Sequence, residues 1–387
     1  MKILQIIQYF SPQRGGPVNN VFNLTRYLQQ RGHEVDIFTS DENFNQEYVK
    51  SIHPARVIAL PSYFGLFRYT PGLEKALKNE ISKYDVIHLN NYWSYQNWVV
   101  SRCARRMNIP YVLTPHGSLP IMMRGYVRKW LYHILIGNQI IQNAAKIIVV
   151  SNMEKDQALK RRIPEGKIKI IPNAVTLSEV AKIKKGAFRT KYNIGKDENI
   201  ILFLGRIHPI KGVDLLVTAF AELVKKRADV RLFIVGPDEN YLDEIKGMVN
   251  NLDLGNKVVF TGPLYNDERY TAYIDSDIYV LPSRYEIFAI SVLEACASGR
   301  PVVVTENQGI ADYIRGRAGE VVPFRVDALL QALEKLLGDK NLRAAYGNEG
   351  RKMVEDIFSW DKVINQYEQL YKEVVFYSDH RSRDQQS

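Results

Sequence analysis

The chain is 387 residues long, with 46% apolar and 24% charged residues, which predicts a soluble globular protein of two or three domains. No apolar run approaches the ~20 residues that cross a bilayer, and the first residues are typical of a strand rather than a signal peptide. We therefore expect a cytoplasmic protein. Cys103 and Cys296 lie far apart without a Cys-x-x-Cys partner, so we expect buried packing residues, not metal or redox chemistry.

Charge is divided unevenly along the chain. Residues 1–190 carry 27 Lys and Arg against 12 Asp and Glu, whereas residues 191–387 carry 25 against 30. The segment 101–150 has seven cations and no anion, and 122–132 mixes cations with Met and aromatic residues. This pattern suits an anionic membrane surface or a phosphate-bearing acceptor, with a solvated basic face as the alternative. Nucleic acid is not favoured, because the chain has no zinc-ligand spacing, ribonucleoprotein aromatic motif or basic low-complexity tail.

The first half of the chain alternates strand and helix patterns. Helical periodicity occurs at 17–30, 95–107 and 129–143. Strands separated by helices predict a parallel sheet covered on both faces. Short apolar, β-branched runs predict the strands 2–8, 34–39, 57–60, 85–89, 111–114, 146–150 and 168–171.

Two loops after predicted strands in this half are candidate ligand contacts. Gly15 and Gly16 precede Pro17 at a helix start, where glycine allows close approach of the backbone to a ligand; an ordinary turn is the alternative. The pattern is not G-x-G-x-x-G, so it does not favour NAD. His116 follows the strand 111–114 and could exchange a proton near pH 7, although a lone loop histidine is more often structural.

The second half repeats the alternation after a Lys-rich stretch at 176–197, which we interpret as the connection between two domains. In open α/β sheets ligands bind beyond the carboxyl ends of the strands, so we expect the loops of both halves to surround one shared cleft. The predicted strands are 200–204, 231–235, 257–261, 278–281 and 302–305.

The strand 200–204 leads into Gly205-Arg206-Ile-His-Pro-Ile-Lys211-Gly212, directly before an amphipathic run at 213–223. Two cations beside a helix start suit a diphosphate, because the free N–H groups there also favour anions. A solvated loop is the alternative.

The strand 278–281 is followed by a turn and the helical run 287–297, and this segment carries two carboxylates eight positions apart. Glu286 lies in the turn and Glu294 within the helix. We expect the backbone at Phe288, Ala289 and Ile290 to hold a phosphate while the carboxylates bind hydroxyl groups. An acidic first turn with one solvated glutamate is the alternative.

These motifs resemble those of the retaining GT-B glycosyltransferases of family 4, in which Gly-Arg-x4-Lys-Gly precedes two glutamates with seven residues between them. The resemblance covers about residues 1–375 and implies an α/β fold of two Rossmann-like domains facing across a cleft. The implied division is an N-terminal acceptor domain at 1–190, a nucleotide-sugar domain at 191–358, a helix at 359–376 that crosses back, and a mobile tail at 377–387.

The resemblance also implies residue roles. Arg206 and Lys211 would stabilise the diphosphate, Glu294 would accept the ribose hydroxyls, and Glu286 would contact sugar hydroxyls. In the N-terminal domain, His116 would contact the transferred sugar near its reacting carbon. The loop at 15–16 would close on the diphosphate.

Asp275 and Asp277 form an Asp-x-Asp pair, which holds a divalent ion in glycosyltransferases of another fold. In the resembling family an aspartate at the second position begins this strand without a metal, so we expect no metal. The chain departs from the family at Ala289, where glycine is common. Its methyl group is expected to reshape the sugar pocket.

We therefore expect a metal-independent, cofactor-free retaining hexosyltransferase that uses a nucleotide-diphosphate sugar. Aromatic loops at 63–69 and 90–95 suit sugar rings, and the acceptor is expected to be a glycan or lipid-linked intermediate of surface polysaccharide or glycoconjugate synthesis. The enzyme would work in the cytoplasm, peripherally on the inner membrane face. The alternatives are a sugar-nucleotide isomerase or epimerase on the same scaffold and a non-catalytic sugar-nucleotide-binding subunit.

Overall fold

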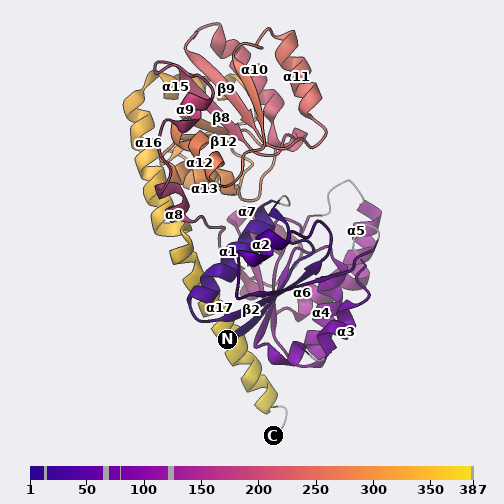
Figure 1. Ribbon diagram of the computed structural model, residues 1–387. Helices are drawn as coiled ribbons and strands as arrows, with labels where there is room; N and C mark the ends of the chain where they lie inside the picture. Colours follow the sequence, from indigo (N-terminus) through magenta and orange to yellow (C-terminus); the bar gives the residue numbers. More distant parts are fainter. Residues whose placement is uncertain (13–14, 64–68, 79, 121–125, 385–387) are drawn as a thin grey trace. The chain divides into compact units, whose positions relative to one another are not determined.

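The computed structural model describes residues 1–12, 15–63, 69–78, 80–120 and 126–384, which form two compact units (Figure 1). Unit 1 comprises Met1–Asn173 and Trp360–Ser387, and unit 2 comprises Ala174–Ser359. The sequence analysis divided the chain at 190–191, whereas the structure assigns 174–190 to unit 2. The reason is that two short helices in this connection, α8 (Leu177–Ala181) and α9 (Ala187–Lys191), pack on α12 (Asn266–Asp275).

Unit 1 contains a seven-stranded, fully parallel sheet in the order β3-β2-β1-β4-β5-β6-β7. Its central strands are almost entirely buried, as expected where helices cover both faces. All seven strands predicted for this half are present. Their bounds are β1 (Lys2–Ile6), β2 (Glu34–Ser40), β3 (Arg56–Leu60), β4 (Val86–Asn90), β5 (Tyr111–Thr114), β6 (Lys146–Val149) and β7 (Ile168–Ile170).

The helices of unit 1 form two groups on the sheet (Figure 1). One group pairs α1 with α17, and the other joins α3, α4 and α6. A π-helix, His133–Gly137, lies between α5 and α6. The bounds are α1 (Gly16–Gln30), α2 (Gln46–Lys50), α3 (Leu73–Lys78), α4 (Tyr95–Arg106), α5 (Tyr126–Tyr132), α6 (Asn138–Asn143), α7 (Asn152–Lys160) and α17 (Trp360–Asp384).

Unit 2 contains a six-stranded parallel sheet in the order β10-β9-β8-β11-β12-β13. Five of these strands were predicted. The sixth, the edge strand β13, was missed. The bounds are β8 (Asn199–Leu204), β9 (Val230–Val235), β10 (Val258–Gly262), β11 (Ile278–Leu281), β12 (Val302–Thr305) and β13 (Gly319–Val322).

The helices of unit 2 also form two groups. In one, α10 packs against α11 and α15, and in the other, α13 packs against α12 and α16. A second π-helix, Val354–Phe358, follows α16. The remaining bounds are α10 (Val213–Val224), α11 (Leu242–Asn251), α13 (Ile290–Ala297), α14 (Ala311–Ile314), α15 (Val326–Gly338) and α16 (Lys340–Met353).

The order of the strands reverses once in each sheet. In unit 1 the strand order reverses between β1 and β4, and in unit 2 it reverses between β8 and β11. Loops that leave such a pair of strands diverge in opposite directions and open a ligand-binding crevice at the carboxyl ends. The predicted site loops follow β1, β8 and β11, so the topology positions them for binding.

The C-terminal helix is longer than the sequence predicted. The final helix, α17, continues to Asp384, beyond the predicted end at 376, so residues 377–384 extend the helix where we expected a mobile tail.

Cys103 and Cys296 are both buried free thiols, as predicted. Burial raises the pKa of Cys296 to about 12, so this thiol is un-ionised at neutral pH.

Candidate active site

Lys211 and Glu286 meet at the point where the strand order of unit 2 reverses. Lys211 ends a 3-10 turn after β8, and Glu286 lies in the loop after β11. The Lys211 ammonium donates to the Glu286 carboxylate, with only 14% and 19% of the two side chains exposed. The structure therefore brings together two residues that the sequence analysis selected from separate motifs.

The two loops are locked together by backbone contacts. Gly212 has a left-handed φ of 69°, and a Cβ atom there would lie 2.0 Å from the Pro282 carbonyl oxygen, so only glycine fits. The Arg284 backbone N–H donates to the Ile210 carbonyl at 2.8 Å.

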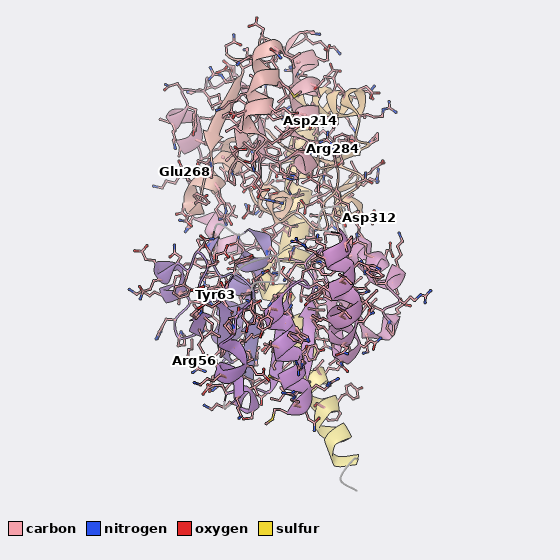
Figure 2. All side chains as sticks on the ribbon, turned by 90° about the vertical axis from the view of Figure 1, so that its right-hand side faces the viewer. Arg56, Tyr63, Asp214, Glu268, Arg284 and Asp312 are labelled. Atoms are coloured by element: carbon pink, nitrogen blue, oxygen red, sulfur yellow. The ribbon has the colours of Figure 1, made fainter. Side chains whose placement is uncertain are left out.

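A side-chain ion pair also holds the loops after β8 and β11 together. The Arg284 guanidinium binds both carboxylate oxygens of Asp214, at 3.0 and 2.6 Å, and Figure 2 shows the two labelled residues side by side. Asp214 lies in the first turn of α10, so this fork joins the β11 loop to the helix that follows the Lys211 loop.

Arg206 points elsewhere. Its exposed guanidinium contacts the Glu239 carboxylate in the loop after β9, and among the residues described no hydrogen bond or ion pair joins it to Lys211 or Glu286. The cation is thus close to the site in sequence and topology, with its charge partly balanced by Glu239.

Helix α13 begins directly behind Glu286. Its N-cap residue Ala289 has extended backbone, with φ −82° and ψ 108°, and makes no side-chain capping hydrogen bond. Phe288 and Ala289 are buried and Ile290 is half-buried. The first N–H groups of a helix have no partner within the helix, so this end can receive the oxygen atoms of an anion.

Glu294 lies deeper in α13 and is only 8% exposed. Its Oε1 atom is 3.1 Å from the Arg269 guanidinium, and its Oε2 accepts a hydrogen bond from the Tyr273 hydroxyl at 3.1 Å. Burial raises the pKa of Glu294, while Arg269 and the Tyr273 hydrogen bond lower it. Because each carboxylate oxygen has its own partner, Arg269 or Tyr273, the Glu294 carboxylate is held in one orientation.

His116 occupies a tight turn after β5 in unit 1. His116 and Gly117 both adopt left-handed backbone, with φ of 51° and 78°, and the His116 Nε2 lies 3.0 Å from Asn90 Oδ1. The residue is half-buried, and burial of its imidazole lowers the pKa of His116 to about 3. The imidazole is therefore neutral at pH 7.

A buried carboxylate supports this turn. The Gly117 N–H donates to Glu154 Oε1 at 2.5 Å and the Val150 N–H to Oε2 at 2.8 Å. Glu154 is fully buried, and burial raises its pKa to about 7, against the opposing effect of those two hydrogen bonds.

The glycine loop of unit 1 is built as a helix start. Gly15 is the N-cap of α1, with φ 80°, and Gly16 and Pro17 begin the helix. A Cβ atom at Gly15 would meet nothing within 4 Å, so it is the left-handed backbone, not crowding, that favours glycine there. The neighbouring residues 13–14 lie outside the described part of the chain.

Asp275 and Asp277 both serve the fold. Asp275 accepts hydrogen bonds from the backbone N–H groups of Gly186, Phe188 and Arg189 at the start of α9. Asp277 binds the Arg189 guanidinium at 2.9 Å and the Ile200 N–H at 2.8 Å. Across the described ranges of the chain, no three His, Cys, Asp or Glu residues cluster as a metal site would require.

Three residues of this arrangement were missed by the sequence analysis: Arg269, Tyr273 and Glu154. Arg269 and Tyr273 are four residues apart on α12, so their spacing places them on one helix face. Glu154 follows Ser151 by three residues, and Ser151 accepts a hydrogen bond from the Glu154 N–H. A Ser-x-x-Glu pattern signals a helix start, but it does not reveal the contact with Gly117.

Two Rossmann-like units with ligand loops at their strand-order reversals define the GT-B class of protein. Residues 14–179 match the family model described as Glycosyltransferase Family 4, and residues 184–353 match Glycosyl transferases group 1. An uncharacterized glycosyltransferase of Methanocaldococcus jannaschii is 27% identical over 389 residues, covering 96% of this chain and 98% of that protein. The chain belongs to the group 1 glycosyltransferases of the GT-B fold and is therefore a glycosyltransferase enzyme.

Solved structures agree with this assignment. Sucrose-phosphate synthase from Thermosynechococcus elongatus is 26% identical with a TM-score of 0.76, covering 96% of this chain and 98% of that one. The Anabaena protein HepE in complex with UDP and glucose shares the fold, at 19% identity and a TM-score of 0.80, with 96% and 100% coverage. Within the described residues, no helix combines the length and apolarity needed to cross a bilayer.

Proposed function

We propose that this enzyme is a retaining hexosyltransferase that moves a sugar from a nucleotide-diphosphate donor to a glycan or lipid-linked acceptor in surface polysaccharide or glycoconjugate synthesis. The observation that carries the proposal is the Lys211–Glu286 pair beside the start of α13. A cation, a carboxylate and free N–H groups are thereby gathered at one crevice, and these are the groups that a sugar diphosphate needs.

The leaving diphosphate determines the chemistry. As the bond between the anomeric carbon and the phosphate oxygen breaks, negative charge grows on the diphosphate. Lys211, Arg206 and the N–H groups of α13 stabilise that charge. The acceptor oxygen bonds to the anomeric carbon on the same face, and its proton passes to the leaving phosphate oxygen. No step requires a metal ion or a covalent enzyme nucleophile.

The carboxylates orient the donor. Glu286 accepts hydrogen bonds from sugar hydroxyls, and its pairing with Lys211 holds it close to the diphosphate cation. Glu294 accepts the ribose hydroxyls with the oxygens that Arg269 and Tyr273 leave available. Ala289 places a methyl group at the start of α13, where it restricts the sugar that fits.

His116 and the glycine loop belong to unit 1, and their proposed ligands are the transferred sugar and the donor diphosphate. Because the His116 imidazole is neutral, it acts as a hydrogen-bond partner of the transferred sugar and not as a proton donor at neutral pH. The backbone at Gly15 and Gly16 closes on the donor diphosphate.

The acceptor is presented at a membrane surface. Five large apolar side chains on α5 and the π-helix are between 45% and 67% exposed. Their spacing of three and four residues forms one stripe on the helix, and Arg128 and Lys129 lie beside it. The rest of the basic run, 121–125, lies outside the described residues. An exposed apolar stripe next to cations in an anion-free segment suits the inner, anionic leaflet. The five residues are Val127, Trp130, Leu131, Ile134 and Leu135.

Binding measurements with a panel of nucleotide sugars test which donor the enzyme uses. Because Anabaena HepE was solved with UDP, and in another structure with UDP-glucose, uridine donors are the first to examine, followed by GDP-, ADP- and CDP-sugars. A bound ligand at 100 times its Kd stabilises the fold by about 2.7 kcal/mol, which thermal unfolding detects. Failure of every nucleotide sugar to raise the melting temperature would overturn the proposal.

Turnover then separates the rival activities. An isomerase or epimerase converts the donor without an acceptor, whereas a transferase leaves the sugar intact until an acceptor extract is supplied. A binding subunit would show thermal stabilisation with no turnover in either mixture.

A further inference from the structure

Arg269 is half-buried against the candidate ribose carboxylate, with 24% of its side chain exposed, and has no role so far. It lies on α12, packed against α13, and its guanidinium is 3.1 Å from Glu294 Oε1. On the other side it lies 3.6 Å from Glu179 Oε2 on α8 and donates to the Tyr270 hydroxyl at 2.9 Å. One half-buried cation is therefore shared between two carboxylates.

The hydrogen-bond capacity of Glu294 leaves room for a ribose hydroxyl. An ionised carboxylate has about four acceptor positions on its two oxygens. The Arg269 guanidinium uses one position on Oε1 and the Tyr273 hydroxyl uses one on Oε2. The Tyr270 hydroxyl, which donates to Glu179, also interacts with Glu294, so at least one acceptor position remains for a ribose hydroxyl. A protonated carboxyl would lose part of this capacity and present a donor instead.

We propose that Arg269 is a positioning residue that holds Glu294 as an acceptor-only carboxylate in a fixed orientation, so that the site selects ribonucleotides over 2′-deoxyribonucleotides. The proposal rests on the proposed function, in which Glu294 meets the ribose. Its new content is the assignment of this selectivity to a residue on α12 that does not itself touch the nucleotide.

The surroundings of Glu294 explain why it needs a cation. At 8% exposure the carboxylate has lost most of its hydration, and an unpaired buried charge is costly. The titratable groups that face it on the remaining sides are Tyr270 and Tyr273 on α12, Tyr279 on β11 and Glu179 on α8. Burial and the Glu179 carboxylate disfavour the ionised form, whereas the tyrosine hydroxyls on α12 favour it through hydrogen bonds. Arg269 is the cation that favours it among the described residues.

Calorimetry of nucleotide binding tests the assignment. UDP, GDP and ADP are titrated into the wild-type enzyme, and the 2′-deoxy form of the tightest binder is then compared with it from pH 6.5 to 9. We expect the ribonucleotide to bind roughly 10- to 150-fold more tightly, the value of one hydrogen bond to a charged group, with a ratio that is flat across this range.

Arg269→Gln removes the cation and keeps a polar side chain. We expect the ratio to fall toward 1 at pH 7 and to recover as the pH rises, because Glu294 then ionises without help. Arg269→Lys keeps the charge and should retain a flat profile, which makes the proposal testable even if the glutamine variant folds poorly. The matched control is Arg231→Gln, which removes another unit 2 ion pair, with Glu198, and should leave both affinities unchanged.

The outcomes separate the two proposals. If the wild-type enzyme binds no nucleotide, the proposed function fails. If it binds ribo- and deoxyribonucleotides equally, Glu294 and Arg269 lose their ribose role while donor binding stands. If Arg269→Gln keeps the wild-type ratio and a flat profile, Arg269 serves only the packing of α12. In a Glu294→Gln background, Arg269→Gln should cause no further loss of discrimination, and an additional loss would also overturn the inference.

Discussion

The ammonium of Lys211 donates to the carboxylate of Glu286, although the two residues are 75 positions apart in the chain. Both side chains are largely shielded from water, so neither charge is well screened. A diphosphate entering this crevice would compete with Glu286 for Lys211, and its charge would be balanced by the lysine as it develops. In the proposed function, the pair would therefore couple donor orientation by Glu286 to leaving-group stabilisation by Lys211.

Loss of either diphosphate cation should slow transfer without creating a need for metal. We expect Lys211→Ala or Arg206→Ala to lower the turnover number by about 100-fold or more, as for the removal of one preorganised electrostatic donor. Treatment of the wild-type enzyme with a chelator should leave the rate largely intact in the same assay. If chelation abolished turnover and manganese restored it, a metal would replace these residues as the source of positive charge.

Glu294→Ala should weaken nucleotide binding by roughly 10- to 150-fold, because a charge-assisted hydrogen bond is worth about 1.5 to 3 kcal/mol. Isothermal calorimetry measures the affinity, and circular dichroism checks that the fold survives. Glu320→Ala is a suitable control, since Glu320 lies on the edge strand β13 and pairs with Lys335. Equal affinities for wild-type and Glu294→Ala would remove Glu294 from the ribose site.

The sequence predicted the fold, and placed the loops of Lys211 and Glu286 at one edge of the sheet, for one physical reason. Parallel strands end at one edge of their sheet, so motifs that follow two strands converge even when 75 residues separate them. The edge strand β13 was missed because Gly-Glu-Val-Val is short and carries a charge, which makes its pattern weak. The end of α17 was missed because residues 377–384 are polar, and composition alone does not tell a solvated helix from a tail.

The partners of the site residues were beyond prediction for a different reason. Arg269 looks like any cation on an amphipathic helix, and only packing of α12 against α13 shows that it faces Glu294. Likewise, the backbone groups that Asp275 binds lie 86 to 89 positions earlier in the chain. Such contacts depend on tertiary structure, for which local patterns carry no signal.

Asp275→Asn should destabilise unit 2 without affecting metal dependence. Asp275 is nearly fully buried and accepts three backbone hydrogen bonds at the start of α9. Asparagine keeps a single acceptor oxygen, so we expect a loss of about 1 to 3 kcal/mol in unfolding free energy. Urea unfolding measures it, with the exposed Asp267→Asn as control. A variant of unchanged stability but with altered response to manganese would restore the metal interpretation.

Glu154 should make stability fall as pH rises from 5 to 8. Its pKa is raised from 4.5 to about 7 in the folded protein, so the native state binds the proton more tightly than the unfolded chain does. The stabilisation is complete below the unfolded pKa and is lost as pH passes the folded one. The change amounts to roughly 3 kcal/mol at the conversion of 1.36 kcal/mol per pKa unit.

Thermal unfolding of wild-type and Glu154→Gln enzyme across this range isolates the effect. The melting temperature of the wild type relative to the variant should decrease from pH 5 to 8. Glu165→Gln serves as the control: the pKa of this exposed carboxyl is lowered by Lys155, so it stays ionised throughout. A wild-type to variant difference that does not change with pH would mean that Glu154 is not the titrating group.

The apolar stripe and the cations beside it should bind anionic vesicles together. Each Lys or Arg near an anionic surface contributes about 1 kcal/mol, and full burial of a large apolar side chain contributes about 1.5 to 3 kcal/mol. In vesicle sedimentation, binding should appear with anionic but not neutral lipid and should fall as salt is raised. Vesicle binding should weaken when Arg124, Arg128 and Lys129 are changed to Gln. It should also weaken when Trp130 and Leu135 are changed to Gln. Changing Lys184, Lys185 and Lys196, exposed cations of unit 2, to Gln is the matched control for charge and should have no effect. Equal sedimentation of all these variants with both kinds of vesicle would show that the stripe and its cations do not meet a membrane.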